Sequence, residues 1–147
     1  MTKYILVLAA LVIGGFLSIQ GSINAHLSSF LKHPLQASLT NFLVGTVILI
    51  LLNVILKTSM PSFAEMKAVP WYLFLGGVIG AMFVTSVVLL IPRIGVTTML
   101  AASIAGQLIV AAVIDHFGFF NVAVHPISLS RVAGIIMLIL GILLIQR

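Results

Sequence analysis

The feature that most constrains this chain is a series of long stretches that contain no charged residue. Four of them cover residues 4–31, 33–56, 68–92 and 94–114, and a shorter one covers residues 132–146. A helix needs about 20 mostly apolar residues to cross a hydrocarbon core of roughly 30 Å, and each of the four long stretches meets that length. The chain is therefore predicted to be an all-α polytopic membrane protein.

Prolines and charged residues at the ends of these stretches predict where the helices begin and end. Pro34 and Pro70 stand at helix starts, where the missing N–H costs nothing, and Pro92 closes the third helix. The fifth helix reaches membrane length if it begins near Ser128 and if Arg131 extends its guanidinium to the headgroups. We predict a single transmembrane domain over residues 1–147, with five helices at about 4–29, 35–56, 70–91, 94–114 and 128–146.

The composition excludes several other classes of protein. Only 6% of the residues are charged and 62% are hydrophobic, whereas about a quarter of the residues of a soluble domain are charged. The net charge of +5 suggests nucleic acid, but the basic residues are scattered between the apolar stretches instead of clustered on one face, so no nucleic-acid partner is predicted. There is no cysteine, and the four histidines lack the spacing of a metal site, so we predict no metal and no cofactor.

The basic residues are almost evenly divided between the two sides of the membrane. Five crossings place Lys3, Lys57, Lys67 and Arg131 on the N-terminal side, and Lys32, Arg93 and Arg147 on the other. Orientation follows the Lys/Arg bias of short loops, and four against three is nearly no bias. Either one misassigned loop or a dominant first helix hides a real bias, or copies insert both ways and pair as an antiparallel homodimer. In the second case, the chain is half of a transporter that a second copy completes.

Polar side chains in the middle of the spans are the candidate binding residues. Gln20 and Asn24 share a face of the first helix, Asn41 lies in the second, and Ser103 and Gln107 share a face of the fourth. Amides at these depths either bond to neighbouring helices or hydrogen-bond a substrate, and the sequence does not separate the two roles.

No carboxylate lies deep inside a predicted span, which argues against exchange of a cation for protons. Asp115 and His116 stand at the end of the fourth helix, and His titrates near neutral pH. They are a candidate proton- or ion-coupling pair, or else a helix-terminal pair that faces headgroup water.

An ordered set of short motifs resembles a known family. They are Gly15 through Leu27 with Gln20 and Asn24, Phe42-Leu43-Val44-Gly45-Thr46, Gly76-Gly77-Val78-Ile79-Gly80, Pro92-Arg93-Ile94-Gly95, Ala105-Gly106-Gln107, Ile114-Asp115-His116-Phe117-Gly118, and Ser130-Arg131 with Gly134. Together they resemble the YdcZ-type branch of the drug/metabolite transporter superfamily over nearly the whole chain.

The resemblance implies a five-helix protein of the bacterial inner membrane, found as single genes, gene pairs or fusions of two oppositely oriented halves. It implies an antiparallel homodimer or an oppositely oriented paralogue as the partner. The four-helix multidrug relatives carry a glutamate in the first helix, whereas Gln20 and Asn24 stand in the first helix here, without an acid.

We expect a secondary transporter that moves a small metabolite or drug-like solute across the inner membrane by alternating access in a dimer. A small dual-topology ion channel, and a non-transporting accessory or sensor protein, are the alternatives. An enzyme is not expected, because no set of nucleophile, base and acid can be assembled from these residues.

Overall fold

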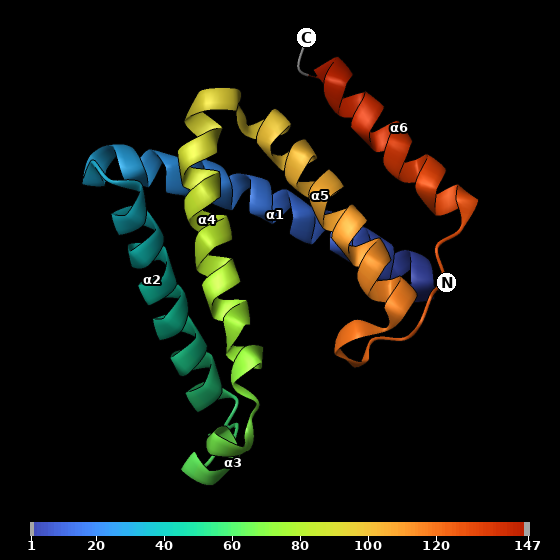
Figure 1. Ribbon diagram of the computed structural model, residues 1–147. Helices are drawn as coiled ribbons and strands as arrows, with labels where there is room; N and C mark the ends of the chain where they lie inside the picture. Colours follow the sequence, from blue (N-terminus) through green and yellow to red (C-terminus); the bar gives the residue numbers. More distant parts are fainter. Residues whose placement is uncertain (1, 146–147) are drawn as a thin grey trace. The chain divides into compact units, whose positions relative to one another are not determined.

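The computed structural model describes residues 2–145, and the side chains of residues 4–145, and every regular element in that range is a helix (Figure 1). The elements are α1 (Thr2–Leu31), α2 (Pro34–Ile55), α3 (Phe63–Ala68), the 3-10 helix η1 (Trp71–Phe74), α4 (Leu75–Ile94), α5 (Val96–Phe117), the 3-10 helix η2 (Phe119–Asn121) and α6 (Leu129–Ile145). The charge count above used Lys3 and Arg147, and the last predicted helix extended to residue 146. The side chain of Lys3 and residues 146 and 147 lie outside the described part of the chain.

Four segments are long and apolar enough to cross a membrane: Tyr4–Leu31, Pro34–Ile55, Trp71–Ile94 and Val96–Phe117. Helix α6, with 17 residues, is a shorter apolar helix. The predicted all-α polytopic membrane architecture is thereby confirmed. The chain divides into two compact units, residues 1–93 and 94–147, which are described in turn, and the single transmembrane domain stays a prediction.

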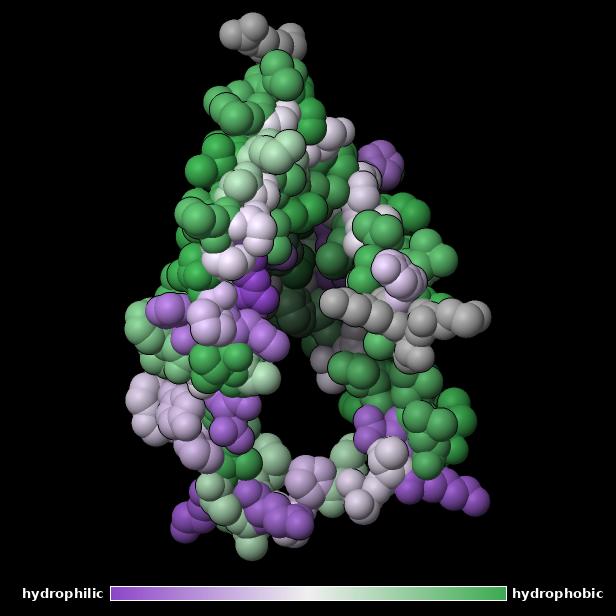
Figure 2. Space-filling view, turned by 90° about the vertical axis from the view of Figure 1, so that its right-hand side faces the viewer, coloured by the Kyte–Doolittle hydropathy of each residue, from purple (hydrophilic) through white to green (hydrophobic). Residues whose placement is uncertain are grey.

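Large apolar side chains face outward along the helices. Phe16 is 63% exposed, Leu43 is 58% exposed and Met137 is 72% exposed. Figure 2 shows hydrophobic side chains over most of the visible surface. In water such a surface would aggregate, whereas lipid tails solvate it, so the exterior is that of a membrane protein.

In the first unit, α1 and α2 form a hairpin with a very short link. Lys32 takes a left-handed conformation (φ 59°), which reverses the chain directly after α1. Pro34 then opens α2, and His33 caps it, because its Nδ1 accepts a hydrogen bond from the N–H of Leu35 at 3.3 Å. The chain therefore turns back from α1 into α2 at a fixed corner.

Helix α4 packs against both arms of this hairpin. A Cβ placed on Gly21 of α1 would lie 3.0 Å from Ile91 Cδ1 and 3.1 Å from Val87 Cγ1, so any larger residue would press on both side chains. On the side of α2, Thr85 donates a hydrogen bond to Ser38 Oγ at 3.1 Å. Close helix approach at a small residue and interhelical hydroxyl bonds are the interactions that hold helices together in lipid.

The link between α2 and α4 contains the six-residue helix α3. Ser62 and Glu65 form a capping box, in which Ser62 Oγ accepts from the N–H of Glu65 and the Glu65 carboxylate accepts from the N–H of Ser62 at 2.7 Å. The hydroxyl of Ser62 also donates to the Glu65 carboxylate at 2.7 Å. This side-chain hydrogen bond first, and then the one from the backbone N–H of Ser62, lower the pKa of Glu65 below its ordinary value of 4.5.

Helix α4 does not end where the sequence predicted. The prediction closed this helix at residue 91, before Pro92, but the helix continues through Pro92 to Ile94. Proline removes a single helix hydrogen bond, to the carbonyl of Val88, and so close to the helix end this loss does not stop the last turn. Gly95 (φ 80°, ψ 160°) ends the helix instead, in a conformation that is essentially open only to glycine, and α5 begins at Val96.

In the second unit, α5 and α6 pack on each other and a structured loop joins them. Gly118 ends α5 in a left-handed conformation (φ 65°), and its N–H donates to the carbonyl of Ile114. A Cβ at Gly118 would lie 2.8 Å from Val124 Cγ2, so the loop folds back over the helix end. Phe120 and Asn121 are also left-handed (φ 58° and 65°).

Candidate functional site

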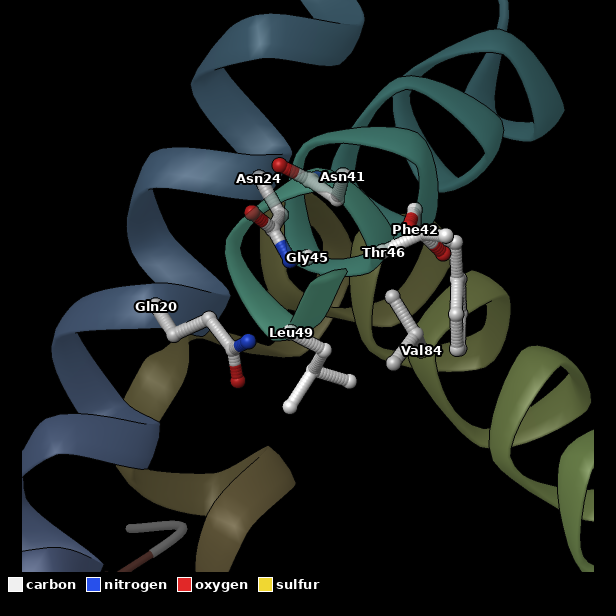
Figure 3. Close-up of a pocket in the computed structure, with 8 residues that line it drawn as sticks. All are labelled: Gln20, Asn24, Asn41, Phe42, Gly45, Thr46, Leu49 and Val84. Carbon is white, nitrogen blue, oxygen red and sulfur yellow. Dashed lines mark hydrogen bonds between the residues drawn. The ribbon is translucent and has the colours of Figure 1, made fainter. Parts of the chain in front are cut away.

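Three of the predicted polar residues meet at one pocket in the first unit. Figure 3 shows Gln20 and Asn24 projecting from α1 toward α2, which contributes Asn41. The pocket has a volume of about 250 Å³, and its other lining residues are Phe42, Gly45, Thr46, Leu49 and Val84. The side chains at i and i+4 on α1 lie on one helix face, which is why Gln20 and Asn24 reach the same cavity.

The carboxamide of Asn41 carries an unsatisfied donor. Its Nδ2 is buried, and no side chain or backbone atom among residues 4–145 hydrogen-bonds to it. A buried N–H without an acceptor costs about 1–3 kcal/mol. A buried donor of this kind is expected at a binding site, where a ligand supplies the acceptor and completes the hydrogen bond.

The other two amides differ in exposure. Asn24 is 3% exposed and is one of two buried polar residues, with Ser38, in the described part of the chain. Gln20, one turn away on the same helix, is exposed. The pocket therefore presents both an exposed and a buried amide, and each offers a donor and an acceptor.

The remaining wall of the pocket is mostly apolar. Thr46 lines it, but its hydroxyl already donates to the carbonyl of Phe42 at 2.7 Å. Phe42, Leu49 and Val84 supply hydrophobic contacts, and Val84 comes from α4. A cavity with an apolar wall and a few converging polar groups is the usual form of a small-molecule site.

Ser103 and Gln107 lie in α5, in the second unit, and neither is among the residues that line the pocket. The hydroxyl of Ser103 donates to the carbonyl of Leu100 at 2.9 Å, within its own helix. Gln107 is exposed on the helix surface. Their role in substrate binding stays a prediction.

Asp115 and His116 are both tied to the loop that follows α5. Asp115 Oδ2 lies 3.2 Å from Arg131 Nη1, and the backbone carbonyl of Asp115 accepts from the N–H of His125 at 2.8 Å. His116 Nδ1 accepts from the N–H of Ile127 at 3.2 Å. Arg131, expected only to reach the headgroups, also donates to the carbonyl of His125 at 3.3 Å. These contacts give Asp115 and His116 a structural role, and their role in coupling to protons or ions stays a prediction.

Sequence reasoning missed the apolar residues of the pocket and the partner of Asp115. Gly45 and Leu49 stand at i+4 and i+8 from Asn41, so the helical period starting from that amide would have found them, whereas Phe42 at i+1 does not share that face. Val84 and Arg131 have no such signal, because each reaches its site through packing between helices.

Comparisons with known proteins agree with this architecture. A family model described as "Putative inner membrane exporter, YdcZ" matches residues 5–144. The "Inner membrane protein YdcZ" of Escherichia coli (strain K12) is 28% identical over 144 residues, which cover 97% of this chain and 95% of that protein. No solved structure shows a significant match to the chain. The resemblance seen in the sequence motifs is confirmed, and the chain belongs to the YdcZ family of multi-pass inner-membrane proteins.

Proposed function

We propose that this membrane transporter protein is one half of a secondary transporter and that the pocket between α1, α2 and α4 binds its substrate. The observation that carries the proposal is the meeting of three carboxamides at one cavity, with a buried and unpartnered donor on Asn41. The matching family is a family of membrane exporters and not of enzymes, which supports transport as the activity and outward movement as its direction.

The chemistry of the pocket supports a neutral or zwitterionic solute. Its polar groups are three amides and the hydroxyl of Thr46, and no charged side chain among residues 4–145 lines it. A permanent cation would find no counter-ion there, and desolvating it would be costly. An acceptor on the solute, such as a carbonyl or hydroxyl oxygen, would take the free N–H of Asn41, and its apolar part would contact Phe42 and Leu49.

A second copy of opposite orientation completes the proposed transporter. The polar residues Ser103 and Gln107 of α5 are candidates for further lining of its central passage, and Asp115 with His116 are the groups to test for coupling to protons or ions. The nearly balanced basic residues support insertion in both orientations, which yields an antiparallel homodimer. Alternating access then arises from movement of one copy against the other.

Counterflow in proteoliposomes tests the binding role of the pocket. A panel of radiolabelled neutral and zwitterionic metabolites is screened for saturable uptake that accelerates when the same compound is loaded inside. The variant Asn41→Leu removes the donor but keeps the number and branching of the side-chain heavy atoms. We expect it to lose uptake by at least about tenfold while its stability stays equal or rises, because a buried unsatisfied N–H is gone.

The control is Asn53→Ala, on the same helix. The Nδ2 of Asn53 donates to the carbonyl of Leu49 at 2.8 Å, and the residue lies outside the pocket lining. It should keep uptake near the level of the unmodified protein. If Asn41→Leu kept full uptake and lost stability instead, the amide would be structural and the proposed site would be wrong.

The same reconstituted protein separates the alternatives. Unitary currents in planar bilayers, without saturation of flux, would indicate an ion channel. Absence of any flux, together with co-purification of a larger membrane protein, would indicate an accessory or sensor protein.

A further inference from the structure

The second unit contains a groove between α5 and α6 that is separate from the amide pocket of the first unit. Its volume is about 480 Å³, within the range of roughly 300–1,000 Å³ typical of ligand sites. The walls are apolar and come from Leu108, Ala111 and Ala112 on α5 and from Gly134, Ile135 and Leu138 on α6. The small residues among them leave the space open, since a Cβ at Gly134 would meet nothing within 4 Å.

One end of the groove carries a charge of each sign. Asp115 and Arg131 line it there and form an ion pair at 3.2 Å, with side chains that are 31% and 41% exposed. Within the described residues, Arg131 donates from Nη1 alone, to Asp115 Oδ2 and to the carbonyl of His125. Asp115 uses only Oδ2 in the ion pair. Donors on Arg131 and an acceptor on Asp115 therefore remain available to a ligand.

The pair lies at one end of the two helices. Asp115 lies two residues before the end of α5, a helix of membrane-spanning length, and Arg131 lies near the start of α6, so a lipid headgroup is expected at this level. From Asp115 to Leu108 the groove descends seven residues, or about 10 Å at the helical rise. A charged end at the surface and an apolar channel below it have the form of an amphiphile.

We propose that this groove binds a phospholipid with a primary-amine headgroup of the ethanolamine type. The phosphate accepts hydrogen bonds from Arg131, the ammonium donates to Asp115, and one acyl chain lies along the apolar walls. A choline headgroup has no N–H to donate to Asp115. An anionic glycerol headgroup pairs with Arg131 but places negative charge beside Asp115. The paired charges thus favour the zwitterionic amine over both.

The test uses the full-length chain in detergent, titrated with phosphatidylethanolamine, phosphatidylcholine and phosphatidylglycerol of identical acyl chains and followed by native mass spectrometry. We expect phosphatidylethanolamine to bind about tenfold more tightly than phosphatidylcholine, and the variant Asp115→Asn to lose most of that preference. Two variants keep both charges. Gly134→Leu fills the groove, whereas Gly141→Leu adds the same side chain to α6 outside it, where there is also open space.

The proposal requires that Gly134→Leu lose lipid binding and that Gly141→Leu keep it. It would be overturned if the three lipids bound equally, or if Gly134→Leu bound lipid normally. A change from dimer to monomer in Gly134→Leu alone would also overturn it, because the groove would then be occupied by a second copy of the chain. None of these readings depends on transport, so they stand apart from the test of the amide pocket.

Discussion

The hydroxyl of Thr85 donates a hydrogen bond to the hydroxyl oxygen of Ser38, 3.1 Å away and 47 residues earlier in the chain. Ser38 is buried and donates in turn to the carbonyl of Pro34 at 3.1 Å. The hydroxyl of Thr85 also lies 2.8 Å from the carbonyl of Ala81, one turn back in its own helix. This chain of contacts joins the start of α2 to the middle of α4.

Removing this link should weaken the contact between α2 and α4. We expect Ser38→Ala to lower the free energy of unfolding by about 0.5–1.5 kcal/mol, the range of interhelical hydrogen bonds in membranes. Denaturation in mixed micelles measures it, and a double-mutant cycle with Thr85→Ala isolates the pair. Ser86→Ala is the control, since that hydroxyl donates to Met82 of its own helix, and an equal loss there would contradict the interhelical role.

A larger side chain at Gly21, where α1 lies against α4, should lower stability more. Gly21→Leu places atoms where Val87 and Ile91 already lie, and overpacking of this kind costs about 1–3 kcal/mol. We expect a lower melting temperature in detergent. Gly14→Leu, on the same helix with open space around it, should melt like the unmodified protein. If both variants melted alike, the approach at Gly21 would not exist in solution.

The end of α5 should be sensitive to a single methyl group. Gly118→Ala combines a left-handed backbone, which costs roughly 1 kcal/mol for alanine, with a contact at 2.8 Å to Val124. We expect thermal destabilisation and faster proteolysis of the loop before α6. Gly106→Ala, in the interior of α5 and with nothing nearby, should be neutral or stabilising. Unchanged proteolysis of Gly118→Ala would count against the loop structure.

The capping box of α3 predicts a pH dependence. The pKa of Glu65 is lowered in the folded chain, so its contribution to stability is present above the ordinary value of 4.5 and is lost as the pH falls through the folded pKa. Ser62→Ala removes the first cause of the shift and should raise the pKa of Glu65 toward 4.5. Carboxyl 13C NMR titration measures it, with Ser59→Ala as a variant outside the box, and an unmoved pKa in Ser62→Ala would refute the assignment.

Charge balance should control orientation if copies insert both ways. Arg93→Gln changes the count of basic residues from four against three to four against two, so more copies should place the N-terminus in the cytoplasm. A fusion of alkaline phosphatase to the C-terminus should then gain activity, and a fluorescent-protein fusion should lose signal. Lys57→Gln with Lys67→Gln leaves two against three and should shift both signals the other way. Fixed signals in every variant would indicate a single orientation.

The sequence predicted the helices and the amide face because both depend on local pattern. Span lengths follow from runs without charge, and the spacing of Gln20 and Asn24 fixes their common face. The continuation of α4 through Pro92 was missed, because a proline near a helix end costs little. The pairing of Asp115 with Arg131 depends on a loop with left-handed residues at Phe120 and Asn121, and no rule of spacing predicts that conformation.

The tight corner at Lys32 and His33 limits how the amide pocket can move. With Pro34 rigid and His33 capping α2, the two helices that carry Gln20, Asn24 and Asn41 cannot spread apart at that corner without breaking the cap. The corner therefore restricts how far the amides of α1 can separate from Asn41. In the proposed transport cycle, the solute would contact the same three amides whichever side of the membrane the pocket faces.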